Sequence, residues 1–311
     1  MSLFQNKNIS PMLLAKESEP FDDPNFIYEL KLDGERCLAY LSADGTEFRN
    51  KRHKKMNAHV PELCEIHRQA KVDCILDGEL MVVKDGVPNF YEIQRRSITT
   101  NAFKIQLLAK QHPATFTAYD ILYYDGEQVT NKPLVERKLL LQSAFDESQR
   151  LARSRFVEEK GVALYRLAEQ QNLEGIVAKR KDSLYKIGAR SKDWIKIKHM
   201  QDEDFVICGY IIKAEKELRT ASLILGLYEG ESLVYQGHVP IGLTREDFKI
   251  IAKQNAVHCP FERAEEDALY IDPTLVCTVE YMMRSSGGGL RQPVFRGLRL
   301  DKTARECVVR L

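Results

Sequence analysis

Residues 28–37 of the chain read "YELKLDGERC". A strand-like apolar segment leads to Asp33-Gly34, and Arg36 lies at the start of a second strand-like segment. An Asp-Gly pair between two such segments indicates a tight hairpin turn, because glycine adopts positive φ at little steric cost. Lys31 stands shortly before this turn. It is either an exposed residue at a strand end or a nucleophile, and the rest of the chain has to distinguish the two.

The same turn signal recurs along the first half of the chain. Further Asp-Gly pairs follow strand-like runs at 44–45, 77–78, 85–86 and 125–126. This recurrence predicts an antiparallel sheet scaffold joined by hairpins. Apolar residues at three- and four-residue spacing predict helices over 135–145, 160–172 and 244–255. Together these patterns place the chain in the α+β class.

The length of 311 residues suggests two domains, since domains usually hold about 100–200 residues. The segment 191–211 ends one basic strand, crosses the polar stretch 199–204 and begins another strand. We therefore predict domains over 1–200 and 201–311. The second region carries several strand-like runs and one helical pattern, which predicts a five-stranded barrel of the OB type. Within it, "SSGGGL" (285–290) reads as a hairpin turn.

The overall composition excludes several classes of protein. Hydrophobic residues make up 44% and charged residues 29%, which is ordinary for a globular protein in water. The formal net charge of +1 excludes a uniformly basic coat but permits local basic patches. The seven cysteines are scattered and form no C-x-x-C pair, so we expect no disulfide framework and a cytoplasmic location. No signal peptide or membrane-spanning run is evident.

A basic stretch lies near the predicted domain boundary. Its end, "WIKIK" (194–198), alternates, so Lys196 and Lys198 share one face of a strand. This face is either exposed to water or binds phosphate, and the stretch alone supports both interpretations equally. The cations of the whole stretch are Lys179, Arg180, Lys181, Lys186, Arg190, Lys192, Lys196 and Lys198.

Two carboxylates lie beside strand-like runs. Glu79 follows Asp77-Gly78, and Glu174 precedes Gly175 at the head of an apolar strand that leads to Lys179. A single glutamate at a strand end is usually exposed to solvent. Two of them beside lysine-rich strands would suit a hard divalent cation such as Mg²⁺, which favours carboxylate and phosphate oxygens.

At this point the chain resembles a known family. "KLDGER" (31–36), "DGE" (77–79), "AYDILY" (118–123), "EGIVAKR" (174–180) and "WIKIK" (194–198) are similar, in this order, to nucleotidyltransferase motifs I, III, IIIa, IV and V of ATP-dependent DNA ligases. "LRQPVFRGLRLDK" (290–302) is similar to motif VI. The resemblance spans residues 11–302. It implies a nucleotidyltransferase (adenylation) domain followed by an OB-fold domain, as in the compact ligases of bacteria and phages.

The resemblance also implies an activity. The chain would be an ATP-dependent DNA ligase that uses Mg²⁺ or Mn²⁺ and acts as a monomer on nicked double-stranded DNA. Lys31 would attack the α-phosphate of ATP and become lysyl-AMP. The AMP would pass to the 5′-phosphate at the nick, and the 3′-hydroxyl would then displace it.

Further residues receive roles from the same resemblance. Glu29 would hold the adenine, and Tyr119 would stack on it. Glu79 would hold the ribose or a metal-bound water, and Glu174 would hold the metal. The remaining ATP contacts would be Arg36, Arg49, Arg190, Lys196 and Lys198 around the ribose and phosphates, with Arg299 and Lys302 at the leaving pyrophosphate.

The tract "RNKRHKK" (49–55) is predicted to bind DNA. It would act with the arginines of the second domain, Arg284, Arg291, Arg296, Arg299 and Arg305, as a clamp on the duplex backbone. Phe48 and Lys51 depart from the Ser-Arg-Asn-Gly that the family usually has around Arg49, so Arg52 is an alternative contact at the nucleotide or nick. The DNA contacts implied are Arg49, Arg52, Lys54 and Lys55; the alternative is a solvated loop.

Two rival functions remain at this point. An RNA ligase or an mRNA-capping guanylyltransferase shares the K-x-D-G motif, and capping would be marked by use of GTP instead of ATP. A non-catalytic nucleic-acid-binding OB protein would bind without covalent adenylylation. The sequence leaves the pathway open among DNA repair, end joining with recombination, and replication of a mobile element.

Overall fold

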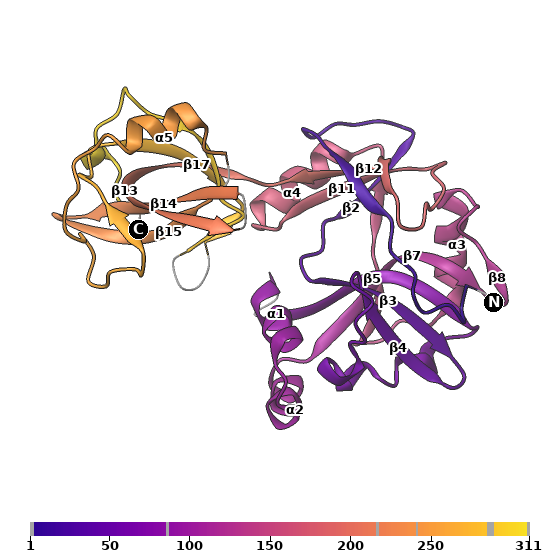
Figure 1. The fold of residues 1–311 in the computed structure, drawn as a ribbon. Coiled ribbons are helices and arrows are strands. Elements are labelled where there is room, and N and C mark those ends of the chain that lie inside the picture. The colour runs from indigo at the N-terminus through magenta and orange to yellow at the C-terminus, as the bar shows by residue number, and fades with distance from the viewer. Residues whose placement is uncertain (1–2, 85–86, 216–217, 241, 285–288, 310–311) are drawn as a thin grey trace. The chain divides into compact units, whose positions relative to one another are not determined.

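The computed structural model describes residues 3–84, 87–215, 218–240, 242–284 and 289–309. The chain divides into two compact units, Met1–His199 and Met200–Leu311 (Figure 1). Each unit has its own core, and each is described by itself below.

The first unit contains two main β-sheets. Sheet A has the order β1 (Leu13–Glu17), β12 (Arg190–Lys198), β11 (Gly175–Arg180), β2 (Phe26–Leu30), β10 (Phe156–Glu158). Sheet B has the order β4 (Gly45–Asn50), β3 (Glu35–Ser42), β5 (Cys74–Lys84), β7 (Ala114–Tyr124), β8 (Glu127–Gln128), with β6 (Val87–Pro88) beside β5 and β9 (Leu151–Arg153) beside β7.

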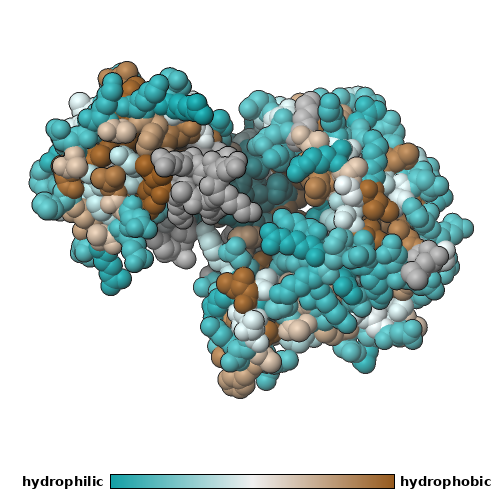
Figure 2. All heavy atoms as spheres, viewed as in Figure 1, coloured by the Kyte–Doolittle hydropathy of each residue, from teal (hydrophilic) through white to brown (hydrophobic). Residues whose placement is uncertain are grey.

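Helices surround these sheets. The α-helices of the unit are α1 (Phe90–Ile98), α2 (Ala102–Gln111), α3 (Leu134–Ala144) and α4 (Gly161–Gln170). Three short 3₁₀ helices cover Asn57–His59, Pro61–Leu63 and Ile66–Gln69. Figure 2 shows a mainly hydrophilic surface with a hydrophobic group over α1 and α2, where Ile98 and Phe103 are among the most exposed apolar side chains.

The two-residue period of the strands gives each sheet two different faces. In β2, Phe26 and Tyr28 pack on the side that α4 covers, whereas Ile27 packs in a cluster with Leu38 of β3 and residues of β5 and β7. Sheets A and B therefore share one apolar cluster between their inner faces. Glu29 continues the parity of Ile27 and points toward this space between the sheets, where Lys138 and Lys179 contact it.

Two of the predicted hairpin turns are wrong. Asp33-Gly34 does not join paired strands: β2 lies in sheet A and β3 in sheet B, so this segment crosses between sheets. Gly34 is required here by close packing, since a Cβ on it would lie 2.2 Å from the Leu80 carbonyl oxygen. Asp77-Gly78 lies inside the continuous strand β5, at a shift in its register with β7.

Other turns and helices agree with the predictions from the sequence. The hairpins at 44–45 and 125–126 are confirmed, because Ser42 pairs with Gly45 and Tyr124 pairs with Glu127. The turn predicted at 85–86, and residues 285–288 of the turn predicted at 285–290, lie outside the described residues. Helices α3 and α4 confirm the predicted patterns. The predicted antiparallel scaffold is confirmed for most strand pairs, but β1 with β12 and β7 with β9 are parallel.

The sequence interpretation missed helices α1 and α2. Each begins after an asparagine whose side chain accepts a hydrogen bond from the backbone amide three residues on: Asn89 from Glu92 at 3.2 Å and Asn101 from Lys104 at 3.0 Å. Such a cap satisfies an amide that the helix itself leaves without a partner. The two asparagines were therefore the signal that could have located these helices.

The second unit is the predicted OB-fold domain, but its main sheet has six strands and not the five that the sequence predicts. The long strand β13 (Gln201–Glu215) pairs through its second half with β14 (Leu218–Glu229) and through its first half with β17 (Val276–Tyr281). The remaining elements are β15 (Ser232–Val239), β16 (Ala268–Tyr270), β20 (Val294–Leu298), the pair β18 (Met283–Arg284) and β19 (Leu290–Arg291), α5 (Arg245–Ile251) and a 3₁₀ turn at Ala304–Glu306.

The polar stretch 199–204 and the last predicted helix differ from expectation. Residues 201–204 already belong to β13 and pair with β17, because their polar side chains find partners across the strands: Asp204, for example, accepts a hydrogen bond from Thr278 at 2.6 Å. Helix α5 ends at Ile251, several residues before the predicted end at 255. All seven cysteines carry free thiols. Among the described residues, none of the helices has the length and apolar character needed to span a bilayer.

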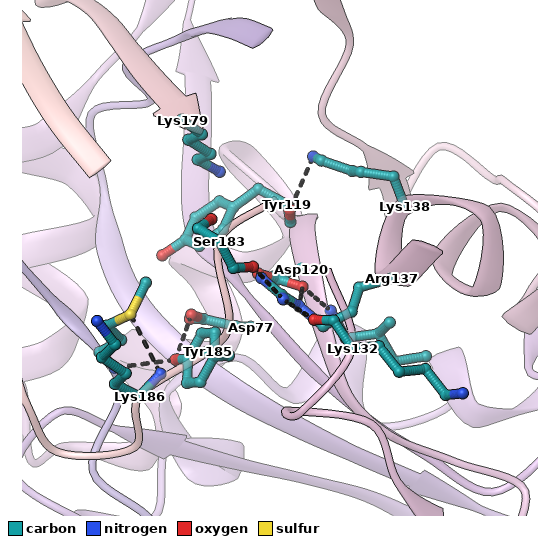
Figure 3. Close-up of polar contacts among 12 residues, drawn as sticks. Asp77, Tyr119, Asp120, Lys132, Arg137, Lys138, Lys179, Ser183, Tyr185 and Lys186 are labelled. Carbon is teal, nitrogen blue, oxygen red and sulfur yellow. Dashed lines mark hydrogen bonds and ion pairs between the residues drawn. The ribbon is translucent and has the colours of Figure 1, made fainter. Parts of the chain in front are cut away.

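A buried ion pair joins α3 to sheet B (Figure 3). Arg137 donates from Nε and Nη2 to the two carboxylate oxygens of Asp120, each at 2.8 Å, and both side chains are fully buried. The same guanidinium donates to the carbonyl oxygens of Lys132 at 2.6 Å and Ser183 at 2.8 Å. Arg137 therefore ties the loop at Ser183 to the helix and the sheet.

We expect Arg137→Met to lower the free energy of unfolding of the first unit by about 3–5 kcal/mol, because Asp120 would be left as a buried charge without its partner. Trp194, the only tryptophan of the chain, lies in this unit, so urea unfolding followed by tryptophan fluorescence reports on it alone. Arg95→Met is the matched control. Arg95 is half-exposed and 3.5 Å from Glu92, and its loss should cost less than about 0.5 kcal/mol. Equal losses in the two variants would contradict this account.

Candidate active site

Lys31 lies in the crossing between β2 and β3, where the two sheets approach each other. Its backbone amide donates to the Gly175 carbonyl at 2.9 Å, which fixes the crossing to β11. Its Nζ is 2.7 Å from Oε1 of Glu174, and the Lys31 side chain remains 23% exposed. The Glu174 side chain is only 4% exposed. The sequence-predicted nucleophile is therefore held by one of the sequence-predicted carboxylates and still reaches the solvent.

Glu79 faces the same space from β5. Burial, aided by the nearby carboxylates of Glu174 and Asp77, raises the pKa of Glu79 to about 8, although Lys31 and Arg36 act in the opposite direction. Burial therefore disfavours the ionised form of this carboxyl more than the two nearby cations favour it. Glu79 and Glu174 thus form a pair of oxygen donors next to Lys31.

Arg36 of β3 is held in place by Asp77 of β5. Its Nε and Nη2 donate to the two carboxylate oxygens of Asp77 at 3.0 and 2.6 Å. Asp77 is fully buried and also accepts the Tyr185 hydroxyl at 2.7 Å (Figure 3). The Tyr185 oxygen in turn accepts the Met12 amide at 3.0 Å. This chain of contacts fixes the guanidinium of Arg36 before any ligand arrives.

Glu29 and Tyr119 are brought together with two buried lysines. Oε1 of Glu29 lies 2.5 Å from Nζ of Lys138 and 3.1 Å from Nζ of Lys179. The Lys179 ammonium also lies 4.5 Å from the centre of the Tyr119 ring and 4.1 Å from that of Trp194. Burial, aided by the Lys138 charge, lowers the pKa of Lys179 to about 8 despite the attraction of Glu29.

The basic strand β12 presents its lysines beside this group. Lys196 and Lys198 share a face, as the alternation predicts, and their Nζ atoms lie 2.8 and 3.9 Å from the carboxylate of Glu17 on β1. Burial lowers the pKa of Lys198, and the charges of Lys196 and Lys31 lower it further. The exposed Arg190 at the start of β12 donates to the Leu14 carbonyl at 3.3 Å.

A cavity of about 530 Å³ opens beside Arg36 and Glu79. Arg52 and Lys54 are among its lining residues, together with Gly34 and Ile98. Arg49 does not line it. Arg49 pairs with Glu47 at 2.7 Å and donates to the His53 carbonyl at 3.0 Å, and Lys55 also lies 3.7 Å from Glu47.

Arg299 and Lys302 lie in the second unit and are held there by carboxylates. Arg299 lies 3.1 Å from Asp204 and pairs with Asp301 through two contacts of 2.8 and 2.9 Å. Nζ of Lys302 lies 2.9 Å from Asp204. The two cations therefore share Asp204.

The sequence-predicted residues of the first unit fall into one main group. Around the space between the sheets lie Glu29, Lys31, Arg36, Glu79, Tyr119, Glu174, Lys196 and Lys198. Arg49 and Lys55 instead gather at Glu47. The sequence interpretation missed Asp77, Tyr185 and Lys138 as members of the site. Asp77 could have been found from its place in the "DGE" motif. Tyr185 and Lys138 could not, because the residues that they contact in the site lie far away in the sequence.

Comparisons with known proteins show what this chain is similar to. A family model of the ATP dependent DNA ligase domain matches residues 11–198, and one of the ATP dependent DNA ligase C terminal region matches residues 216–302. The SPbeta prophage-derived DNA ligase-like protein LigB of Bacillus subtilis is 28% identical, with 94% of this chain and 99% of that protein aligned.

Longer relatives and solved structures match as well. The multifunctional non-homologous end joining protein LigD of Pseudomonas aeruginosa is 30% identical over 96% of this chain, which spans only 36% of that relative. The ligase domain of LigD from M. tuberculosis has a solved structure with a TM-score of 0.57 and 26% identity, covering 98% of this chain and 99% of that one. A mycobacterial DNA ligase D complexed with ATP and MES gives a TM-score of 0.56 at 25% identity, covering 97% and 99% of the two chains.

The pKa of Glu79 leads to a pH prediction. The pKa of Glu79 is 4.5 in the unfolded chain and about 8 in the folded protein, so between these pH values only the folded protein holds a proton on Glu79. The free energy of unfolding therefore falls as the pH rises through this range. Glu79→Gln should remove this loss and be about 1–3 kcal/mol more stable than the wild type at pH 8 without nucleotide or metal. Urea unfolding at several pH values measures the difference.

A matched control for this experiment is Glu65→Gln, since Glu65 is an exposed carboxylate paired with Arg68 on the surface. Its stability curve should run parallel to that of the wild type. Parallel curves for Glu79→Gln and the wild type would show instead that Glu79 ionises normally.

Proposed function

Because this chain belongs to the ATP-dependent DNA ligases, and is an enzyme of that kind, we propose that Lys31 is the residue that carries AMP during the reaction. The observation that supports this assignment is the position of Lys31. Its ammonium reaches solvent at the edge of the space between the two sheets, 2.7 Å from Glu174 and close to Glu79. An exposed lysine at an ordinary strand end would have no such buried carboxylates around it.

The proposed reaction consists of three transfers. Lys31 loses a proton, its Nζ bonds to the α-phosphorus of ATP, and the bond from that phosphorus to pyrophosphate breaks. An oxygen of the 5′-phosphate at a nick then attacks the same phosphorus, and the bond between that phosphorus and Nζ of Lys31 breaks. Finally the 3′-hydroxyl attacks the 5′-phosphate, and AMP is released. Charge increases on phosphate oxygens in each step, and Lys198, Lys196 and Arg190 would stabilise it.

The nucleotide would lie between the sheets. Glu29 and Tyr119 would hold the adenine, and Arg36 with Glu79 would hold the ribose. The rigid contacts of Arg36 with Asp77 support this role, because a preorganised group loses less entropy on binding. Arg299 and Lys302 of the second unit would meet the leaving pyrophosphate, and their shared partner Asp204 keeps the two cations together.

A divalent metal fits the residues present. Among the described side chains no group of three His, Cys, Asp or Glu residues forms a complete metal cage. Glu79 and Glu174 supply hard oxygen donors, and the Glu79 carboxyl is buried beside the carboxylates of Glu174 and Asp77. Two carboxylates plus phosphate oxygens are what Mg²⁺ or Mn²⁺ commonly uses beside a nucleotide. When bound, the metal would offset the negative charge of the phosphates.

Nicked double-stranded DNA would contact the cavity beside Arg36. Arg52 and Lys54 are exposed and line it, whereas Arg49 is engaged with Glu47. We therefore prefer Arg52 to Arg49 as the contact at the nick. Lys54 and Lys55 would add phosphate contacts from the same tract.

The biological setting is proposed from the relatives. The names of the longer relatives refer to non-homologous end joining and that of the shorter one to a prophage. We propose that the chain acts as a monomer in the cytoplasm and seals nicks during DNA repair or end joining. Its free cysteines are consistent with a reducing compartment.

The central test uses α-labelled nucleotides. Incubation of the protein with Mg²⁺ and α-labelled ATP should give label that stays on the protein after denaturation. Lys31→Ala should abolish this label, because the phosphoramidate bond is formed by the lysine amine. α-Labelled GTP should give little label. Lys110→Ala, at an exposed lysine of α2, is the control and should label like the wild type.

Each other outcome has a distinct meaning. Label retained in Lys31→Ala would remove Lys31 as the nucleophile. Preferential labelling by GTP would favour a capping enzyme. Absence of label from either nucleotide, in folded protein free of bound AMP, would contradict the proposed reaction.

DNA binding provides a second test. Arg52→Ala should weaken binding to a nicked duplex several-fold and reduce the slope of log K against log salt by about one, as expected for the loss of one phosphate contact. Arg49→Ala should change the slope less, since Arg49 is paired with Glu47. Fluorescence anisotropy with a labelled nicked duplex at several salt concentrations measures both. A larger effect of Arg49→Ala, or a flat salt response of the wild type, would overturn the assignment.

A further inference from the structure

Lys138 occupies an unusual place for a lysine. It projects from α3, its side chain is only 7% exposed, and its ammonium has two partners on different sheets. Nζ lies 2.5 Å from Oε1 of Glu29 on β2 of sheet A. It also donates to the backbone carbonyl of Tyr119 on β7 of sheet B at 2.8 Å (Figure 3). One ammonium group therefore connects Glu29 and Tyr119.

These contacts fix the distance between the two residues that are proposed to hold the adenine. Glu29 would contact the edge of the base and Tyr119 its face. The contact with Glu29 is an ion pair away from water, and the contact with the Tyr119 carbonyl is a hydrogen bond from a charged donor. Both kinds of interaction are stronger away from water, so a buried lysine can keep both groups in one arrangement. Lys179 approaches the same Glu29 oxygen at 3.1 Å but makes ring contacts with Tyr119 and Trp194 instead of bonding the Tyr119 backbone.

Lys138 also sets the charge of Glu29. Burial alone would raise the pKa of Glu29, but the charges of Lys138 and Lys179 outweigh it and leave the pKa lowered. An ionised carboxylate only accepts hydrogen bonds. At position 6 of the purine ring, adenine carries an amino donor and guanine a carbonyl acceptor, so an ionised Glu29 that faces this position attracts adenine and repels guanine.

From these contacts we propose that Lys138 is a positioning residue that makes the enzyme select adenine over guanine. It acts through Glu29 and Tyr119 and does not touch the phosphates. The proposal rests on the proposed function, namely that Lys31 is adenylylated with the adenine held at Glu29.

The test compares lysyl-nucleotide formation with ATP and with GTP. Lys138→Met keeps the length of the side chain and removes its charge. We expect it to lower the ratio of kcat/KM for ATP to that for GTP by about tenfold or more, mainly through a higher KM for ATP, since a site loses discrimination when its polar group is misplaced. Lys138→Arg should restore most of the ratio. Lys110→Met, on the exposed face of α2, should behave like the wild type.

A double variant tests whether Lys138 acts through Glu29. In a Glu29→Gln background, Lys138→Met should cause little further change in the ATP-to-GTP ratio, because residues that act as a unit are not additive. An additive effect would overturn the proposal, as would an unchanged ratio in Lys138→Met. Equal loss with both nucleotides would also overturn it, because that is the signature of a structural role only.

Two further outcomes distinguish a folding defect, a failure of the proposed function and a failure of the proposed role of Lys138. If Lys138→Met fails to fold by circular dichroism, Lys138→Gln retains a donor for the Tyr119 carbonyl and removes only the charge, and the same drop in ratio is expected. Failure of the wild type to label with ATP would reject the proposed function itself. Labelling of the wild type, with an ATP-to-GTP ratio that no Lys138 variant alters, would reject only the role of Lys138.

Discussion

The site depends on one constraint, the alternation of side chains along two β-sheets whose inner faces meet. Residues on the outer faces pack under α4 or in the core of sheet B, and residues on the inner faces either fill the shared cluster or line the site. In β2 this places Ile27 in the core and Glu29 at the site, and Lys31 follows directly after the end of the strand. In β12 it places Trp194 in the core and Lys196 and Lys198 nearer the opening. The two-residue alternation along the strands therefore places both the core residues and the charged residues of the site.

Buried charge is costly unless each group has partners, and the first unit supplies them in sets. Asp120 has Arg137, Asp77 has Arg36 and the Tyr185 hydroxyl, and the remaining set is Glu29 with Lys138 and Lys179. Each set links segments that are distant in the sequence. Glu79 differs, since burial raises its pKa more than Lys31 and Arg36 lower it. The metal and polyphosphate proposed for this site would add the missing positive charge and ligands.

Much of this arrangement could be predicted from local sequence, and some could not. The helices α3 and α4 follow apolar periodicity, and the hairpins at 44–45 and 125–126 follow turn chemistry. Asp33-Gly34 looks like the same turn in the sequence but connects two different sheets. A glycine is required there because the Leu80 carbonyl comes too close for a side chain, and not because the backbone has a positive φ. Helices α1 and α2 were missed although Asn89 and Asn101 cap them.

The sequence by itself determined which side chains share a face of each strand, which motifs occur in order, and hence the family. These properties depend on neighbours along the chain, where the period of a strand and the shape of a turn are set. Only the tertiary structure decided that sheet A faces sheet B, that Arg52 lines a cavity while Arg49 is paired with Glu47, and that Lys138 reaches Glu29. Contacts of this kind join residues far apart in the chain, and they form only because packing of the whole unit brings those segments together.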